Sequence, residues 1–499
     1  MTDTTTPTRT AQISTDSTPE QVAAAAAAAA GAARAFGDPD ASDLRIAALQ
    51  AVASSLEEAG SELVALAQEE SALAEGRLTG ELARTVYQLR LFADCLAEGS
   101  LLEATVDTAD PDWLLGPKPD LRRLLVPIGP VAVYAASNFP FAFSVAGGDT
   151  ASALAAGCPV VLKAHPGHPR LSVRTAELVV EALTAAGAPA GTFGLVSGLD
   201  AGSALITEPA IKAGSFTGSI AGGRALFDLA SGRPDPIPFY GELGSINPAF
   251  VTRRAAAARA QQIADGFVGS FTMGAGQFCT KPGVLFVPSD SHLAELIAAG
   301  AREVGPAPML NDRILDGYRS NVSGLANQGA IHTLVEGTVD GDRLGPTVLG
   351  TDLTSLLESA DALLHECFGP TALVVTYDDQ QDLLDAARAF EGNLTATIQG
   401  EDADATELTD LTYELAQRAG RVLWNGWPTG VAVTWAMQHG GPWPATTGSV
   451  HTSVGPTAMR RFMRPLSFQD MPDALLPSIL RRTDPTSSVR RVNGALELR

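Results

Sequence analysis

The 499-residue sequence has few cysteines and few basic residues for its size. Its four cysteines, Cys95, Cys158, Cys279 and Cys367, are too sparse and too widely spaced for a disulfide framework or a CxxC zinc site. Free thiols in a reducing compartment are therefore expected, and we predict a cytoplasmic protein. The 34 Lys and Arg residues against 56 Asp and Glu give a net charge of −22. This balance argues against nucleic acid or an anionic membrane as the main partner, because phosphates would be repelled.

Long hydrophobic runs and familiar metal or nucleotide motifs are also missing. The most apolar stretch, residues 22–33, is nearly all alanine and too short to span a bilayer. Acidic residues precede it, so it lacks the basic start of a signal peptide, and it predicts a surface helix packed through small side chains. The sequence contains no Walker A motif, GxSxG elbow or HExxH motif. His165 and His168 have no third ligand nearby and indicate a loop pair, so no metal site is predicted.

Hydrophobic residues at 45% and charged residues at 18% indicate a compact protein with large cores. Residues 1–18 are rich in Thr, Ser and Pro and are expected to be mobile, and residues 19–105 follow helical spacing. Beyond them, short apolar strands alternate with helices, which predicts an α/β fold with parallel sheets covered on both faces. The expected strands fall into two series: 131–135, 159–163, 192–196 and 211–216, and then 249–251, 284–287, 371–376, 395–398 and 421–424. We therefore expect two α/β units in tandem.

Cys279 is the candidate nucleophile. It follows Gly274, Gly276 and Gln277, and these glycines let the backbone approach another group closely. A free cysteine is more often a small buried hydrophobe. Reactivity at Cys279 would require thiolate character, favoured by a helix N-terminus or a nearby cation.

Glu242 and Asn138 are the candidate general base and oxyanion donor. Glu242 lies in an apolar turn between glycines, where burial is expected to raise its pKa toward that of a useful base. Asn138 follows an apolar strand, where its carboxamide can donate to a developing oxyanion. The simpler interpretations are a solvated loop glutamate and an ordinary turn-forming asparagine.

Two segments are candidates for binding a nucleotide. Lys163 ends an expected strand, and nucleotides bind at the carboxyl ends of strands in open α/β sheets. The turn with Gly218, Ser219 and Gly223 follows another strand and opens a helix whose N–H groups can bind phosphate. The turn is not the GxGxxG fingerprint, and Lys163 alone is equally a strand-end lysine with its charge in solvent.

Taken together, these segments resemble the aldehyde dehydrogenase superfamily, in order, from about residue 119 to 475. The matching motifs are Asn138-Phe-Pro, Lys163, Phe216-Thr-Gly-Ser with Gly223, Glu242-Leu-Gly, Gly276-Gln-Phe-Cys279, Glu366-Cys-Phe-Gly-Pro370 and Trp424-Asn425-Gly. Glu242 and Cys279 are 37 residues apart, near the family's separation. The stretches 138–144, 163–166, 239–248 and 439–446 are most similar to the branch of α-ketoglutaric semialdehyde (2,5-dioxopentanoate) dehydrogenases and NADP-dependent fatty aldehyde dehydrogenases.

The resemblance implies a Rossmann-like cofactor domain, an α/β catalytic domain and a small oligomerisation arm. We assign residues 19–118 and 138–241 to the NAD(P)-binding domain, 242–450 to the catalytic domain, and 119–137 with 475–499 to the arm. Pairing of exposed strands through such an arm implies a homodimer or homotetramer.

The resemblance also implies the chemistry: Cys279 attacks an aldehyde, Asn138 stabilises the oxyanion, hydride leaves to the nicotinamide, and Glu242 activates water to release the acid. Glu366 and Phe368 are implied on the nicotinamide side and Lys163 on the adenosine side. Relatives that transfer the acyl group to coenzyme A commonly lack the Glu242 carboxylate, so water is the predicted acceptor.

Two departures from the family pattern matter. Ser245 replaces the second glycine of Glu-Leu-Gly-Gly and is expected to alter packing beside the base. Lys163-Ala-His-Pro replaces Lys-Pro-Ala-Glu, so the glutamate that binds the adenosine ribose hydroxyls of NAD is missing. We therefore predict that NADP is accepted and preferred, with NAD possible, and that His165, His168 and Arg170 are the candidates to contact the 2′-phosphate.

The substrate is a small aldehyde, and 2,5-dioxopentanoate is the leading expectation. The nearest alternative is a long-chain fatty aldehyde, for which Phe139, Phe141 and Phe143 would line an apolar tunnel. A carboxylate-bearing substrate instead needs a cation in the pocket, which the sequence alone does not place. A catalytically idle scaffold with this fold is the alternative of another class, and the presence of Cys279, Glu242 and Asn138 speaks against it.

Overall fold

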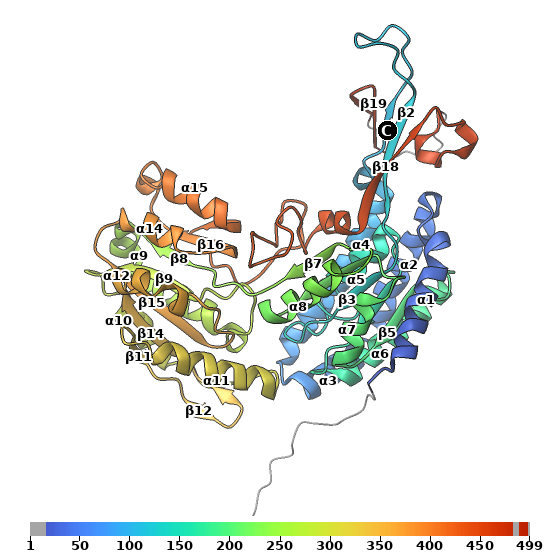
Figure 1. Ribbon diagram of the computed structural model, residues 1–499. Helices are drawn as coiled ribbons and strands as arrows, with labels where there is room; N and C mark the ends of the chain where they lie inside the picture. Colours follow the sequence, from blue (N-terminus) through green and yellow to red (C-terminus); the bar gives the residue numbers. More distant parts are fainter. Residues whose placement is uncertain (1–15, 483–488, 498–499) are drawn as a thin grey trace, which may run out of the picture. The chain divides into compact units, whose positions relative to one another are not determined.

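The computed structural model describes residues 16–482 and 489–497 (Figure 1). Most of the tail expected to be mobile, residues 1–15, therefore lies outside the described residues. The chain divides into two compact units. Among the described residues, the first comprises 16–216, 226–239, 456–482 and 489–497, and the second comprises 217–225 and 240–455.

The first unit opens with four helices: α1 (Pro19–Phe36), α2 (Ser42–Glu58), α3 (Gly60–Ser71) and α4 (Glu75–Glu98). Helix α1 contains the alanine-rich stretch, and Thr18 and Gln21 form a capping box at its start. Val22, Ala26 and Ala29 recur at helical spacing and are buried in the hydrophobic core of the unit. This confirms the prediction of a helix packed through small side chains.

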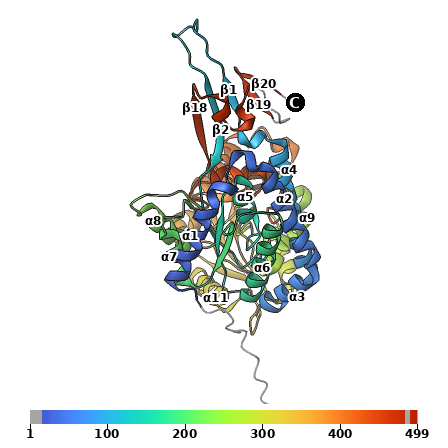
Figure 2. The same ribbon diagram turned by 90° about the vertical axis from the view of Figure 1, so that its right-hand side faces the viewer.

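A five-stranded sheet forms the centre of the first unit, in the order β5-β4-β3-β6-β7. Its strands are β5 (Phe193–Val196), β4 (Val160–Lys163), β3 (Val131–Tyr134), β6 (Ala213–Thr217) and β7 (Phe239–Glu242). The connecting helices are α5 (Gly148–Ala156), α6 (Pro169–Ala185), α7 (Leu199–Thr207) and α8 (Ile220–Ser231). Strands β3 to β6 are parallel, and Figure 2 shows α1 and α7 on one side of the sheet and α6 on the other. The expected α/β pattern is confirmed here.

A second five-stranded sheet of this unit extends away from its helices in both views (Figures 1 and 2). Its order is β18 (Met463–Gln469), β2 (Leu121–Pro127), β1 (Thr105–Asp107), β19 (Arg490–Val492) and β20 (Ala495–Glu497). This sheet corrects the predicted arm, 119–137 and 475–499. Val131–Tyr134 is β3 of the other sheet, whereas β18 lies outside the predicted arm and pairs with β2 along its whole length.

The second unit is built on a seven-stranded sheet in the order β11-β14-β15-β9-β8-β16-β17, in which only β11 is antiparallel to its neighbour. The strands are β11 (His332–Val335), β14 (Thr347–Asp352), β15 (Thr371–Tyr377), β9 (Val284–Pro288), β8 (Ala249–Val251), β16 (Asn393–Gln399) and β17 (Ala419–Trp424). A small sheet adds β10 (Ala307–Pro308), β13 (Arg343–Leu344) and β12 (Val339–Asp340).

Helices cover both faces of the seven-stranded sheet, so its five inner strands are almost entirely buried, whereas the edge strands β11 and β17 are partly exposed. They are α9 (Arg253–Thr272), α10 (Leu293–Arg302), α11 (Asp312–Ala326), α12 (Leu353–Glu358), α13 (Ala360–Leu363), α14 (Asp382–Arg388) and α15 (Thr409–Arg418). One hydrophobic cluster joins the sheet to α9 and α10, and a second joins it to α12, α14 and α15. Burial on both faces explains why these strands read as continuous apolar runs. The second unit also includes residues 217–225, which the sequence assigns to the cofactor domain; the functional roles of the two units stay predictions.

Candidate active site

Cys279 lies in the second unit, just beyond a short 3₁₀ turn (Met273–Gly276) at the end of α9. Gly276 has a φ of +66°, and a Cβ there would lie 2.1 Å from the carbonyl oxygen of Gly369. The glycine is therefore required for a close approach of two backbone segments. Among the described residues Cys279 is the half-buried thiol, whereas the other three cysteines are buried.

Asn247 fixes the backbone that carries Cys279. Its Nδ2 donates to the carbonyl oxygens of Cys279 at 2.8 Å and Lys281 at 2.9 Å, and its φ is +57°. Ser245 Oγ donates to Asn247 Oδ1 at 2.7 Å and accepts from the N–H of Leu394 at 2.9 Å. Ser245, which replaces the second glycine of the family motif, is thus buried and stabilises the loop that carries the candidate nucleophile.

Glu242, at the end of β7, meets the loop between residues 425 and 455. An antiparallel bridge joins Glu242 to Thr446, and the N–H of Leu243 donates to the carbonyl of Ala445. This pairing places Nε2 of the buried His439 2.9 Å from Glu242 Oε1, while Ser453 Oγ donates to Glu242 Oε2 at 2.5 Å. The same Nε2 is 3.6 Å from Cys279 Sγ. Two residues predicted for catalysis therefore meet at a histidine to which the sequence assigned no role.

The direction of the Glu242 pKa shift differs from the sequence-based expectation. Burial is the largest single influence and would raise the pKa, as expected. The charge and hydrogen bond of His439, with the hydrogen bonds of Ser453 and Cys279, together outweigh it and lower the pKa. The prediction of a raised pKa was wrong because the sequence does not show which donors face a buried carboxylate.

Asn138 lies in the first unit, in a loop that packs against one face of α4. Arg77 donates to the carbonyl oxygen of Asn138 at 2.6 Å, and its guanidinium lies over the ring of Phe139. Glu81 Oε1 accepts the N–H groups of Phe141 at 2.8 Å and Ala142 at 3.0 Å. Arg84, one further turn along, lies over Phe143. A buried carboxylate between two arginines therefore holds the loop that carries the candidate oxyanion donor.

The predicted adenosine-side residues also lie in the first unit. Lys163 ends β4, with its side chain packed beside Gly202 of α7. His165 Nδ1 accepts from the N–H of Gly167, whereas His168 is buried between Ser172 and the carbonyl of Ala136. Burial lowers the pKa of His168, and both of its ring nitrogens are hydrogen-bonded inside the unit, so the structure does not support its predicted contact with a 2′-phosphate.

Arg170 has two acidic neighbours on α3. Its guanidinium pairs with Glu69 and Glu70, and Glu70 also accepts the N–H groups of Arg170 and Leu171 at the start of α6, both at 3.0 Å. A phosphate would have to compete with these carboxylates for the Arg170 side chain. Its role in cofactor binding stays a prediction.

The remaining cofactor candidates lie in the second unit. The N–H of Gly218 donates to the carbonyl of Glu242, Ser219 Oγ accepts from the N–H of Gly222 at 3.2 Å, and the N–H of Gly223 donates to the carbonyl of Ser219. The turn is thus tied directly to the residue of the candidate base. Glu366 lies farther along the same unit, and Phe368 follows it after one residue.

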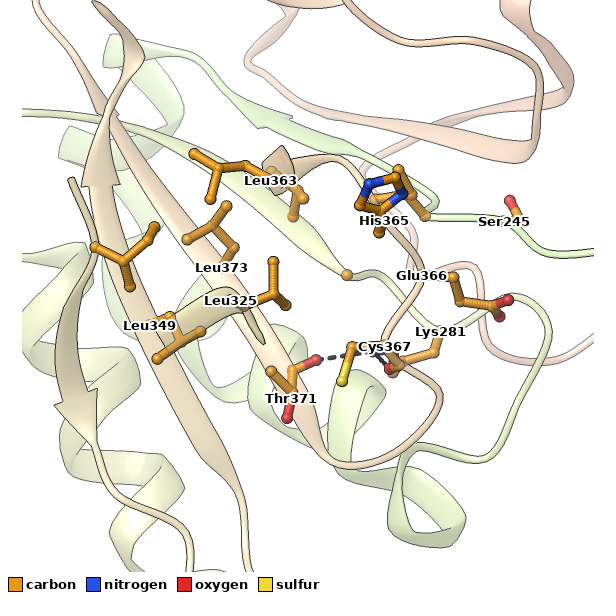
Figure 3. A pocket seen from close by; sticks show the side chains of 14 residues that line it. Ser245, Lys281, Leu325, Leu349, Leu363, His365, Glu366, Cys367, Thr371 and Leu373 are labelled. Atoms are coloured by element: carbon orange, nitrogen blue, oxygen red, sulfur yellow. Dashed lines mark hydrogen bonds between the residues drawn. The ribbon is translucent and has the colours of Figure 1, made fainter. Parts of the chain in front are cut away.

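Glu366 lies at the polar end of a pocket (Figure 3). Leu325, Leu349, Leu363 and Leu373 line the opposite, apolar end. A Cβ on Gly244 would lie 2.6 Å from Glu366 Oε2, so this carboxylate lies against the backbone two residues beyond Glu242. Burial raises the pKa of Glu366 to about 7, opposed by the charge of Lys281 and the N–H of Ser245. A carboxylate beside a glycine backbone fits an acceptor for ribose hydroxyls next to the base, as expected for a nicotinamide nucleotide.

Comparison with known proteins decides the family. The sequence profile described as "Aldehyde dehydrogenase family" matches residues 2–465. The chain belongs to the aldehyde dehydrogenase family. It is an NAD(P)-dependent oxidoreductase of small aldehydes, and the expected fold and enzyme class are confirmed.

Two bacterial relatives are similar along most of the chain. The α-ketoglutaric semialdehyde dehydrogenase of Acinetobacter baylyi is 42% identical, covering 90% of this chain and 86% of the relative. The α-ketoglutaric semialdehyde dehydrogenase 2 of Azospirillum brasilense is 44% identical, covering 91% and 87%. Of the solved structures, a γ-glutamyl-γ-aminobutyraldehyde dehydrogenase from Burkholderia cenocepacia is 25% identical with a TM-score of 0.75, covering 90% of this chain and 88% of that one.

A bifunctional proline utilization A protein is also similar in structure, with a TM-score of 0.78 and 26% identity. The match covers 92% of this chain but 46% of that protein, so this aldehyde dehydrogenase spans about half of its length. Within residues 16–482 and 489–497, no helix has both the length and the hydropathy to cross a membrane.

Sequence reasoning missed three polar residues of this region. His439 and Ser453 come from a stretch without regular secondary structure, and the signal for His439 was a histidine among glycines and prolines. Lys281, two residues after Cys279, is buried and donates to the carbonyls of Cys367 at 2.7 Å and Thr371 at 2.8 Å. It thereby anchors the segment that carries Glu366.

Proposed function

We propose that this aldehyde dehydrogenase oxidises 2,5-dioxopentanoate to 2-oxoglutarate, with NADP as the preferred cofactor and water as the acyl acceptor. The meeting of Cys279 and Glu242 at His439 Nε2 supports the reaction class. The two bacterial relatives, both named α-ketoglutaric semialdehyde dehydrogenases, support the substrate. An idle scaffold is not favoured, because the two reactive groups meet in a supported site.

Cys279 is the nucleophile in this proposal. Its thiol proton passes to the Glu242–His439 pair, and the sulfur adds to the aldehyde carbon to form a thiohemiacetal. The Asn138 carboxamide and the Cys279 N–H donate to the oxyanion, each contributing about 3–4 kcal/mol. A bound nicotinamide, its ribose held by Glu366, would supply the hydride acceptor that converts this adduct into a thioester on Cys279.

The thiol proton leaves the Glu242–His439 pair to solvent, after which Glu242 takes a proton from water and the water oxygen adds to the thioester carbon. The sulfur leaves as a thiolate and the carboxylic acid is released. Ser453 and His439 orient the carboxylate through one hydrogen bond to each oxygen. The lowered pKa keeps Glu242 ionised at neutral pH, so it is ready to accept the proton.

Two residues are proposed to hold the ribose ends of the cofactor. Glu366 accepts from the nicotinamide ribose, and Lys163 contacts the adenosine side. Without a carboxylate after Lys163-Ala, a 2′-phosphate is not repelled, and His165 is better placed to meet it than Arg170, which is paired with Glu69 and Glu70. A ratio of kcat/KM for the two cofactors that strongly favours NAD would contradict this preference.

The charges on α4 favour an anionic substrate over a fatty aldehyde. Arg77 and Arg84 lie over Phe139 and Phe143, the rings that would line an apolar tunnel. Phe141 is buried in the core. Guanidinium groups beside the Asn138 loop suit a substrate with a carboxylate, and their desolvation disfavours a long alkyl chain.

Oligomerisation and compartment belong to the same proposal. Leu114 and Leu115, between β1 and β2, are 92% and 79% exposed, and such an apolar tip supports pairing of the arm with a second copy as a homodimer or homotetramer. Four free cysteines support a reducing compartment, and we propose the cytoplasm.

The decisive experiment is an aldehyde panel with NADP, followed by the absorbance of the reduced cofactor. We expect the highest kcat/KM for 2,5-dioxopentanoate, a lower value for butanal, which lacks a carboxylate, and the lowest for decanal. A preference for decanal would replace the proposal with the fatty aldehyde alternative. No oxidation of any aldehyde would reject both.

A further inference from the structure

Glu242, Cys279 and His439 are also a ligand set for a thiophilic metal ion. Their carboxylate oxygen, Sγ and imidazole nitrogen all lie within 4.8 Å of one another. Thiolate, imidazole and carboxylate are the three ligand types that zinc takes in proteins. All three residues belong to the second unit, so the cluster is complete within one compact body.

The distances fit a tetrahedral ion. Zn–S bonds of about 2.3 Å and Zn–N bonds of about 2.0–2.1 Å place sulfur and nitrogen about 3.6 Å apart in a tetrahedron. Cys279 Sγ and His439 Nε2 are 3.6 Å apart. The nitrogen and Glu242 Oε1 are 2.9 Å apart and would have to separate to about 3.4 Å, which follows when their hydrogen bond is exchanged for two metal bonds.

We propose that Zn²⁺ binds to Cys279, His439 and Glu242 and inhibits the enzyme by occupying its nucleophile and base. The inhibition rests on the proposed function, whereas the binding rests on the geometry alone. On binding, Sγ–Zn, Nε2–Zn and Oε1–Zn bonds form, the hydrogen bond between Nε2 and Oε1 breaks, and the thiol proton with any proton on Nε2 leaves to water. A water molecule completes the fourth position, as in sites with three protein ligands.

Two features make the cluster a built site. Asn247 fixes the backbone of Cys279, and Ser453 binds the second oxygen of Glu242, so two of the ligands are positioned before any ion arrives. A thiolate and a carboxylate also balance the two charges of the ion, so the filled site is neutral in a largely buried environment. Cys279 is half-buried, which leaves a route for entry.

The first test measures binding without reference to activity. Purified full-length enzyme is dialysed against Zn²⁺ alone and its bound metal is counted, and Co²⁺ is added to a second sample. We expect a single ion per chain and a near-ultraviolet sulfur-to-cobalt charge-transfer band, which reports a thiolate ligand. Bound Zn²⁺ should also slow alkylation of Cys279 by iodoacetamide, and chelation should restore it.

Variants of the ligands identify the site. Cys279→Ser and His439→Gln each remove a ligand and should weaken Zn²⁺ binding by more than about a hundredfold. His451→Gln and Cys95→Ala are matched controls, because His451 packs edge-to-face against Tyr240 and Cys95 is buried in α4. The controls should bind Zn²⁺ like the unmodified enzyme. Since the cobalt spectrum uses the unmodified enzyme, the test stands even if a ligand variant fails to fold.

The outcomes separate this inference from the proposed function. Absence of the charge-transfer band, or equal Zn²⁺ affinity in Cys279→Ser, His439→Gln and the controls, would overturn the metal site while leaving aldehyde oxidation untouched. Stoichiometric binding at these ligands without loss of aldehyde oxidation would overturn the inhibition. Binding by an enzyme that oxidises no aldehyde would leave the site intact and reject the function.

Discussion

Glu81 fixes the loop that carries Asn138, so its removal is expected to slow the chemical step from a distance. Its Oε1 accepts the N–H groups of Phe141 and Ala142, three and four residues beyond Asn138. Glu81→Ala removes this acceptor and leaves two N–H groups without their partner, whereas Glu81→Gln keeps an oxygen in the same place. The two variants therefore separate the acceptor from the charge.

The size of the effect on kcat follows from the two hydrogen bonds that are lost. An N–H bond to a charged acceptor contributes about 1.5–3 kcal/mol, so the loop gains by moving to recover the two bonds lost in Glu81→Ala. A shift of about 1 Å at a positioned catalytic group costs about a hundredfold in rate. Loss of one oxyanion donor costs about 10²–10³-fold, which is the ceiling if Glu81 acts only through Asn138. We expect kcat to fall about 10–100-fold in Glu81→Ala and KM to change little.

The assay is a double-mutant cycle in steady-state kinetics. Once Asn138→Ala has removed the donor, adding Glu81→Ala should reduce kcat little further. Glu81→Gln should retain most of the activity. Glu70→Ala is the matched control, because Glu70 also accepts two N–H groups in the same unit, but at the start of α6. At saturating NADP its kcat should stay close to that of the unmodified enzyme.

Additive losses in the double variant would refute this reasoning, because Glu81 would then act independently of Asn138. A Glu81→Gln variant as slow as Glu81→Ala would refute the role of the acceptor oxygen. Equal losses of kcat in Glu70→Ala and Glu81→Ala would indicate general destabilisation of the unit.

Four further expectations follow from the same contacts. Cys279→Ala should abolish oxidation, and Glu242→Gln should still give a burst of reduced cofactor while blocking turnover; full steady-state activity in either would contradict the roles assigned. His439→Gln removes the charge and hydrogen bond that lower the pKa of Glu242, so the acid limb of the kcat profile should move to higher pH. Burial raises the pKa of Glu81 from 4.5 to about 7, so the folded protein binds the proton more tightly. The free energy of unfolding in urea should then fall by about 3 kcal/mol as pH rises from 4.5 to 7, more steeply than in Glu81→Gln; parallel curves would count against the shift. The double variant Leu114→Asp, Leu115→Asp should have a lower molar mass by light scattering, because charged side chains would weaken the contact between copies. An unchanged mass would exclude this tip from the interface.

The inner strands of the two large sheets could be predicted because they are buried on two faces. Val160–Lys163, Val284–Pro288 and Thr371–Tyr377 are continuous apolar runs bounded by turn residues, and that pattern is local. The arm sheet could not be predicted in the same way. Its strands β1, β19 and β20 have three residues each, and β1 pairs with β19 from the other end of the chain, almost four hundred residues later. Only a short Pro-Gly-containing break separates β2 from β3, so the sequence does not show that they enter different sheets.

The residues of the candidate site that stand in family motifs could be predicted from the sequence. Those that reach the site from a distant loop could not. Cys279 and Glu242 stand in motifs with family spacing, so both could be chosen from the sequence. His439 reaches them through the bridge between Glu242 and Thr446, which leaves no periodic signal. The pKa shift of Glu242 could likewise be predicted only in part. Burial of Glu242 could be inferred from its apolar turn, but the donors that reverse its pKa shift come from residues about 200 positions later.

A lowered pKa creates a conflict for Glu242, because a base of low pKa takes protons weakly. The same hydrogen bonds show which residue can assist Glu242 as a proton acceptor. His439 Nε2 faces both Glu242 Oε1 and Cys279 Sγ, so a proton removed from the thiol or from water can be shared between carboxylate and imidazole. The pair, and not Glu242 alone, is then the functional base. In the proposed mechanism one proton acceptor both activates the thiol and hydrolyses the thioester, in keeping with a candidate nucleophile and a candidate base that face the same nitrogen.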